Sequence, residues 1–244
     1  MAITKALAII AGVGPGTGAA VAKRFAQEYN VVLLARSTSS LDPVVQEIQS
    51  LGGNAFGIPT DISDAKSVDE AFKQIAAKYP GTAVSAAVFN ASAGLIKKPF
   101  LELSAEEWNS TWTVNGTGAF LFSQAVLPLL VASKHLAHPP TLIFTGATAG
   151  IKAFPNSATF AAGNFAKRAL SQSLAKEFGP QGIHVSYAVI DGVIDIPKTK
   201  AWLNDVPDAK ISPDAIANAY WHIHTQPRTA FTWEIDIRPY VEKW

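Results

Sequence analysis

The stretch AGVGPGTG, residues 11–18, decides how this chain folds. It follows an apolar run at residues 5–10, which has the continuous hydrophobicity of a strand buried on both faces. It precedes a helical pattern at residues 19–29. Glycines at such a junction permit a tight turn, let the backbone approach a pyrophosphate and leave the helix N-terminus free to bind it. The segment predicts a dinucleotide-binding loop, although a strand–helix turn without a ligand is the alternative for these residues alone.

Strands and helices alternate along the rest of the chain. Ser63 and Asp64 can cap one helix, and Ser104 with Glu107 forms the capping box of a long helix that we carry to about Leu130. Alternation of this kind requires crossover connections between parallel strands.

We therefore expect one α/β domain over residues 1–244: a doubly wound Rossmann fold with a mainly parallel seven-stranded sheet and helices on both faces. A short substrate lid is expected around residues 195–211. The expected strands are residues 5–10, 31–35, 54–59, 84–89, 141–145, 183–189 and 231–237, and the expected helices are residues 19–29, 40–51, 104–130 and 159–178, with two more beginning after Asp64 and Ser212.

The composition excludes several classes of protein. The 244 residues contain no cysteine, so disulfides and thiolate metal sites are excluded, and the five histidines lack the spacing of metal ligands. A formal net charge of +1 gives no reason to expect nucleic acid or an anionic membrane as partner. We expect no bilayer-spanning segment, and the apolar stretch within residues 1–12 is too short for a signal peptide. A cytoplasmic protein is the expectation.

Arg36 indicates which dinucleotide is bound. An acidic residue at the end of the second strand would hold both ribose hydroxyls of NAD. Here Ala35 is neutral and Arg36 follows it. A guanidinium can pair with the 2′-phosphate of NADP through charge-assisted hydrogen bonds. An ordinary solvated arginine at a strand end is the alternative.

Several motifs together resemble the short-chain dehydrogenase/reductase family. The glycine loop has the G-x-x-x-G-x-G spacing of that family, FNA at residues 89–91 follows the fourth strand, and TVN at residues 113–115 lies in the long helix. The stretch AKRALSQSLAKEFGPQGIHV at residues 166–185 is similar to its helix and strand. FTGATA at residues 144–149 and WEIDIRPY at residues 233–240 resemble one branch of the family.

The resemblance implies NADP(H) as cofactor, a small-molecule substrate and a homodimer or homotetramer built on the two long helices. Asp61 matches the acid that contacts adenine, although it could also cap the helix that follows. The residues implied to bind the cofactor are Gly12, Gly16, Gly18, Arg36, Asp61, Ile62, Asn90, Ala91 and Ile194.

The sequence departs from the family at the positions that carry catalysis. Family members use an asparagine, a serine, a proton-transferring tyrosine and a lysine that lowers the tyrosine pKa. The resemblance places Asn115 at the asparagine position, but Phe160 at the tyrosine position and Asn164 at the lysine position.

The serine position falls at Ala147, with Thr148 as the nearest hydroxyl. Lys167 lies almost a turn past Asn164, and its helical phase argues against it as a substitute for the lysine. The threonine position that holds the nicotinamide carboxamide is Ile196. The adenine half of the site is therefore expected to be intact and the reactive half altered.

Three functions remain open on these residues. A reductase could work without the tyrosine, because hydride transfer to an iminium needs no proton and a ketone could take one from water or Thr148. A non-redox cyclase or isomerase could use the pocket to fix substrate geometry. A regulatory protein could bind NADPH without catalysis, since fold alone does not set function.

Overall fold

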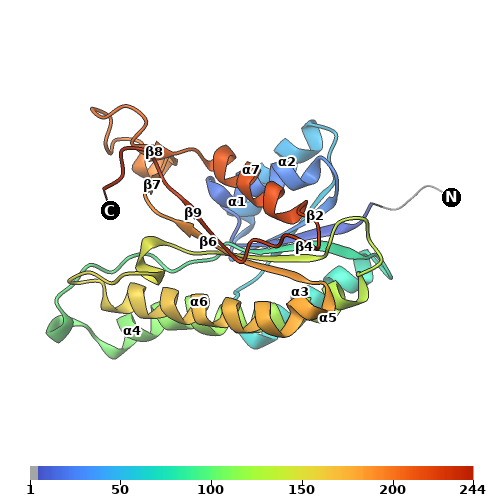
Figure 1. Ribbon diagram of the computed structural model, residues 1–244, viewed down its shortest axis with the longest axis horizontal. Helices are drawn as coiled ribbons and strands as arrows, with labels where there is room; N and C mark the ends of the chain where they lie inside the picture. Colours follow the sequence, from blue (N-terminus) through green and yellow to red (C-terminus); the bar gives the residue numbers. More distant parts are fainter. Residues whose placement is uncertain (1–4, 244) are drawn as a thin grey trace.

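The computed structural model describes residues 5–243 and shows a seven-stranded sheet between two layers of helices (Figure 1). The strands of this sheet are β1 (Leu7–Ala11), β2 (Asn30–Ala35), β3 (Ala55–Pro59), β4 (Val84–Phe89), β5 (Thr141–Thr145), β6 (His184–Ile190) and β9 (Glu234–Ile237). Their order is β3-β2-β1-β4-β5-β6-β9, and all neighbours pair in parallel. The expected doubly wound Rossmann fold is confirmed. Residues 1–4, part of the stretch for which no signal peptide is expected, lie outside the described residues.

Helices cover both faces of the sheet because each presents an apolar stripe to it. One layer packs residues such as Phe25, Leu41 and Ile216 against the sheet, and the opposite layer packs Val68 and Phe122. The first layer consists of α1 (Thr17–Ala26), α2 (Thr38–Ser50) and α7 (Pro213–His224), and the second of α3 (Ala65–Lys78), α4 (Ala105–Trp112), α5 (Ala119–Ala132) and α6 (Ala158–Phe178) (Figure 1).

Short elements join these layers, and some were not expected from the sequence. A second sheet pairs β7 with β8 beside the carboxyl end of β6, and each of its strands has only two residues. β9 begins three residues later than expected. The short elements are β7 (Val193–Ile194), β8 (Lys210–Ile211), the 3-10 turns η1 (Phe100–Glu102), η3 (Thr148–Gly150), η4 (Gly179–Gln181) and η5 (Pro197–Thr199), and the π-helical segment η2 (Thr113–Gly118).

The capping residues fix where two helices begin. The Ser104 hydroxyl accepts from the Glu107 N–H at 3.2 Å, while the Glu107 carboxylate accepts from the Ser104 N–H at 2.8 Å, which confirms the capping box. Asp64 caps α3 by accepting from the Lys66 N–H. The long helix expected up to Leu130 is α4 and α5 joined through η2, where the helix widens to a π turn.

The prediction that no segment is long and apolar enough to span a bilayer is wrong. Ala105–Ala132 is long and apolar enough to do so by length and composition alone. In this fold Phe122, Val126 and Leu130 of that stretch are buried in the core beside the sheet. A helix that supplies core residues needs the same apolar content as a membrane span, so composition does not distinguish the two.

Candidate active site

Two cavities adjoin where the parallel strands end. β1 neighbours both β2 and β4, so the chain turns to opposite sides of the sheet at β1, and such a switch point opens a crevice beyond the carboxyl ends of the strands. The larger cavity has a volume of about 1020 Å³ and the smaller about 640 Å³. Both are lined by Gly12, Gly14, Asn90 and residues 92–95, so the glycine loop forms their common wall.

The backbone of the glycine loop packs too closely for side chains at three positions. Gly12 has φ +89°, and a Cβ there would lie 2.3 Å from the Ala91 nitrogen. A Cβ at Gly18 would lie 2.5 Å from the Gly12 oxygen, and one at Gly16 would lie 2.7 Å from Ile196 Cγ2. Gly12 and Gly18 are therefore required by contact with neighbouring backbone, whereas a Cβ at Gly16 would meet the side chain of Ile196.

Asn90 ties the loop to the end of β4. Its side-chain amide donates to the Gly12 oxygen at 2.8 Å, and its backbone N–H donates to the Ala11 oxygen at 2.8 Å. Gly16 is the N-cap of α1 and has no side chain to cap it. The N–H groups of Ala19 and Ala20 donate to the Gly14 and Gly16 oxygens, so the N–H groups of Thr17 and Gly18 are the ones that could reach an anion at the cavity wall.

The smaller cavity is lined by Arg36, Asp61, Ile62 and Ala91, four of the residues expected to bind a cofactor. Arg36 is exposed and makes no hydrogen bond or ion pair within residues 5–243. Asp61 accepts from the Ser63 hydroxyl at 2.6 Å and from the Ser63 N–H at 2.9 Å, and these bonds lower the pKa of its carboxyl. Asp61 therefore closes the turn that precedes α3, and the residue that caps α3 is Asp64.

The larger cavity brings together the residues expected around the reacting group, with one exception. Thr148, Phe160, Asn164 and Ile194 all line it. Asn115 does not line either cavity; it is fully buried behind them in η2.

Asn164 and Asn115 differ in how their amides are satisfied. Asn164 donates to the Phe160 carbonyl oxygen of its own helix at 2.9 Å. Neither amide atom of Asn115 has a hydrogen-bond partner within the described part of the chain. The Asn115 nitrogen lies 3.2 Å from where a Cβ on Gly163 would be, so this glycine lets α6 approach η2.

Lys167 also lies at this cavity, although its helical phase does not favour it as a substitute for the family lysine. It is 1% exposed and lines the larger cavity together with Asn164. Its Nζ has no hydrogen-bond partner among residues 5–243 and lies 5.8 Å from the centroid of the Phe89 ring. Burial lowers the pKa of Lys167 to about 7. In the sequence, the feature that could have pointed to Lys167 is a charged residue on the face of a helix that is expected to be buried.

Thr148 and Asp191 form a second polar group at the cavity wall. The Thr148 hydroxyl donates to Asp191 Oδ1, and the other Asp191 oxygen lies 3.3 Å from Arg238 Nη1. Arg238 also pairs with Asp236. The proton of the Thr148 hydroxyl therefore points to the carboxylate, and the hydroxyl presents lone pairs to the cavity. The position of Asp191 directly after a buried strand was the sequence signal for it.

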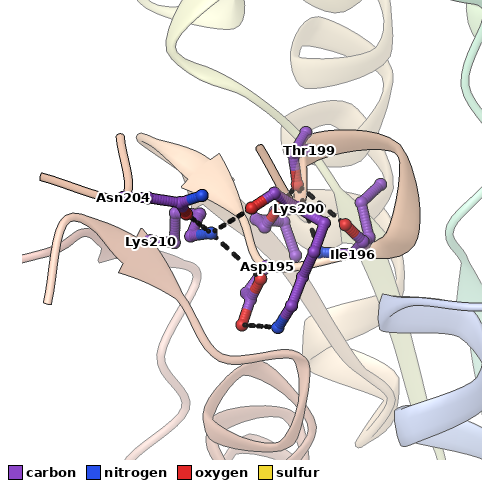
Figure 2. A network of polar contacts seen from close by, with 7 residues as sticks. Asp195, Ile196, Thr199, Lys200, Asn204 and Lys210 are labelled. Atoms are coloured by element: carbon purple, nitrogen blue, oxygen red, sulfur yellow. Dashed lines mark hydrogen bonds and ion pairs between the residues drawn. The ribbon is translucent and has the colours of Figure 1, made fainter. Parts of the chain in front are cut away.

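Residues 195–211, which the sequence predicts to form a substrate lid, are held by polar contacts (Figure 2). Lys210 reaches Asp195 at 3.3 Å and Asn204 at 3.0 Å, and the Thr199 hydroxyl donates to the Ile194 oxygen at 2.5 Å. Ile196 contacts the glycine loop at Gly16, as described above. This segment therefore lines the side of the larger cavity next to the loop.

Comparison with known proteins identifies the family. The family profile described as short chain dehydrogenase matches residues 6–207. The chain belongs to the short-chain dehydrogenase family. This family binds nicotinamide cofactors and acts on small molecules. An uncharacterized oxidoreductase of Staphylococcus aureus (strain USA300) is 28% identical over 240 residues, which cover 97% of this chain and 98% of that protein.

Solved structures of family members share the whole architecture. A short-chain dehydrogenase from Rhodopseudomonas palustris is 29% identical with a TM-score of 0.81, covering 98% of this chain and 100% of the other. An alcohol dehydrogenase from Thermococcus sibiricus, complexed with 5-hydroxy-NADP, is 25% identical with a TM-score of 0.81, covering 98% of each chain.

Proposed function

We propose that this protein is an NADP(H)-dependent reductase of a carbonyl or imine group in a small molecule. The observation that carries the proposal is the pair of adjoining cavities. One is lined by an exposed arginine that makes no hydrogen bond or ion pair within residues 5–243, and the other ends in buried polar groups. The glycine loop between them suits a pyrophosphate, because it ends at the N-terminus of α1, where the N-cap Gly16 has no side chain to occupy the helix N–H groups. When bound there, a reduced nicotinamide supplies a hydride.

The choice of NADP(H) over NAD(H) rests on Arg36. Its guanidinium lines the smaller cavity, and Ala35 leaves no carboxylate there to hold a ribose diol. Gly12, Gly16, Gly18, Asp61, Ile62, Asn90, Ala91 and Ile194 complete the proposed cofactor-binding set. The related alcohol dehydrogenase from Thermococcus sibiricus, complexed with an NADP derivative, supports the same choice.

The reactive half of the site lacks the usual phenol and lysine of the family. Phe160 and Asn164 line the cavity where the resemblance places those two groups. Phe160 cannot give a proton, and the Asn164 amide is engaged with its own helix. A carbonyl must therefore take its proton from another group, whereas an iminium needs none.

We also propose assembly as a homodimer or homotetramer. Four large apolar side chains on α4 and α5 remain exposed in the single chain: Trp108, Trp112, Phe120 and Leu129. An apolar patch of this kind is typical of an interface between copies. Sedimentation should give a mass of two or four times 25.9 kDa at micromolar concentration.

The test of the proposed function is NADPH oxidation measured with an iminium ion and a ketone, beside titration of NADPH and NADH against tryptophan fluorescence. We expect NADPH to bind at least about tenfold more tightly than NADH, since a charge-assisted hydrogen bond contributes about 1.5–3 kcal/mol. NADPH should be oxidised in the presence of the iminium. Tight NADPH binding without oxidation of any substrate would favour a regulatory or non-redox role.

A further inference from the structure

Polar atoms without partners gather where α6 packs on α4 and η2. Among residues 5–243, the hydroxyls of Thr111 and Thr159, both amide atoms of Asn115 and the Nζ of Lys167 are buried with no hydrogen-bond partner. Gly163 allows the close packing there, since a Cβ on it would touch both Asn115 and the Thr111 oxygen. Buried polar groups are normally hydrogen-bonded, so a group of exceptions at a cavity wall calls for a functional explanation.

Lys167 connects this group to the larger cavity. It lies one helical turn after Gly163, and long side chains in a helix run back toward the N-terminus. Its amine is therefore carried to the level of Gly163 and Asn164, next to Phe89 at the end of β4. Both Lys167 and Asn164 line the cavity. This reach explains how a residue of unfavourable helical phase contributes to the site.

The two residues expected closest to the reacting group, Thr148 and Phe160, are poorly suited to give up a proton. The Thr148 hydroxyl proton is directed to Asp191, and Phe160 has none to give. The lining lysines other than Lys167 are solvent-exposed: Lys152, Lys198 and Lys243. Lys167 is the one buried amine in the described lining.

We propose that Lys167 is the proton source for carbonyl reduction in this site. The inference rests on the proposed reductase function. A hydride from NADPH forms the new C–H bond, the carbonyl π electrons move to oxygen, and an N–H bond of the Lys167 ammonium breaks to form the O–H bond. The products are an alcohol, NADP⁺ and a neutral amine, which then regains a proton from solvent. With a pKa of about 7, the amine exists in both forms near neutral pH.

No charged group among residues 5–243 contributes to the lowered pKa of Lys167, although Arg168 follows it in α6. β5, η2 and η3 have no titratable side chain, and α4 has Glu106 and Glu107 in its first turn. β6 has His184 and Tyr187, where burial lowers the pKa of the histidine and raises that of the tyrosine. Desolvation is the only cause of the lowered pKa of Lys167.

The test uses Lys167→Met, which keeps the length of the side chain and removes the amine, with Lys176→Met on the exposed face of the same helix as the control. NADPH oxidation is followed from pH 5.5 to 9 with two probes, ethyl pyruvate and the N-methyl-3,4-dihydroisoquinolinium ion. The ketoester needs a proton, and the permanent iminium does not.

We expect Lys167→Met to lower ketoester reduction about 100-fold and to change iminium reduction less than about threefold. The wild-type ketoester rate should fall as pH rises through about 7, because the ammonium is lost, and the variant rate should not. A structural defect would lower both reactions equally. Lys176→Met should match the wild type in both.

A measurement on the protein without cofactor checks the amine directly. In protein labelled with [ε-¹³C]lysine, one resonance should titrate near pH 7 and be absent from Lys167→Met. Ketoester reduction with an unchanged rate and pH profile in Lys167→Met would overturn the role of Lys167 alone. Failure of the wild type to oxidise NADPH with either probe would overturn the proposed reductase function itself.

Discussion

The two cavities that share the glycine loop are built in different ways. The smaller one and its loop depend on backbone: glycines that pack against the β4 end, N–H groups at the start of α1, and Asp61 held by Ser63. The larger one depends on side chains, and several of them, including Asn115 and Lys167, are buried without partners among the described residues. Backbone geometry tolerates few substitutions, whereas the chemistry of side chains can change while the fold stays. We therefore expect the cofactor to bind at the end built on backbone, the cofactor end, and we propose that the end built on side chains, the reactive end, is where the chemistry of the site has changed.

Restoring the reactive end is expected to have the largest effect. Phe160→Tyr with Asn164→Lys should raise ketone reduction by about 10²–10⁴-fold, because a phenol with a lowered pKa supplies general acid catalysis. The double variant should exceed the product of the two single changes, since the residues act as a unit. Steady-state NADPH consumption by all four proteins is the measurement. Additive single effects would mean that the two positions do not form one catalytic unit.

Blocking the cofactor end is expected to have the next largest effect. In Gly18→Ala the new methyl group would lie 2.5 Å from the Gly12 oxygen, so the loop must move out of its position. NADPH affinity should fall about 100-fold in a fluorescence titration, with the fold retained by circular dichroism. Gly179→Ala is the matched control, because no atom lies within 4 Å of a Cβ there. Unchanged affinity in Gly18→Ala would separate the loop from cofactor binding.

Removing the guanidinium should have a smaller and more selective effect. Arg36→Ala should weaken NADPH binding about tenfold and leave NADH binding nearly unchanged, because only NADPH has the 2′-phosphate. Raising the salt concentration should weaken NADPH binding to the wild type more than to the variant. Equal losses for both cofactors would show that Arg36 supports the cavity wall and does not select the phosphate.

More of the residues proposed for the adenine side than of those proposed for the reactive side can be placed from the sequence, for a physical reason. Glycine spacing and the Ala35-Arg36 pair act through local backbone and strand position, which are visible in the order of residues. Lys167 could not be placed by helical phase alone, because its flexible side chain spans nearly a turn of α6. The link from Thr148 through Asp191 to Arg238 joins residues far apart in the chain, and only the fold brings them together.

The differences between the predicted and the observed secondary structure have similar causes. The strands of the main sheet are four to seven residues long and most of them are largely apolar, so the sequence pattern predicts them. β7 and β8 have two residues each, too few for any periodicity. Ala105–Ala132 passes a test for membrane spans because a core helix in a layered α/β protein is equally apolar. An apolar composition indicates that a helix is buried, but it does not indicate whether protein or lipid surrounds the helix.

The most direct test of the contrast between the two ends is to measure cofactor affinity and ketone turnover on one wild-type preparation. Tryptophan fluorescence gives the NADPH and NADH dissociation constants, and absorbance gives NADPH consumption with an ordinary unactivated ketone. An intact cofactor end with an altered reactive end predicts micromolar or tighter binding of NADPH, at least about tenfold weaker binding of NADH, and turnover well below the range of about 1–10³ per second that is usual for enzymes. Ketone turnover within that usual range, or no binding of either cofactor, would contradict it.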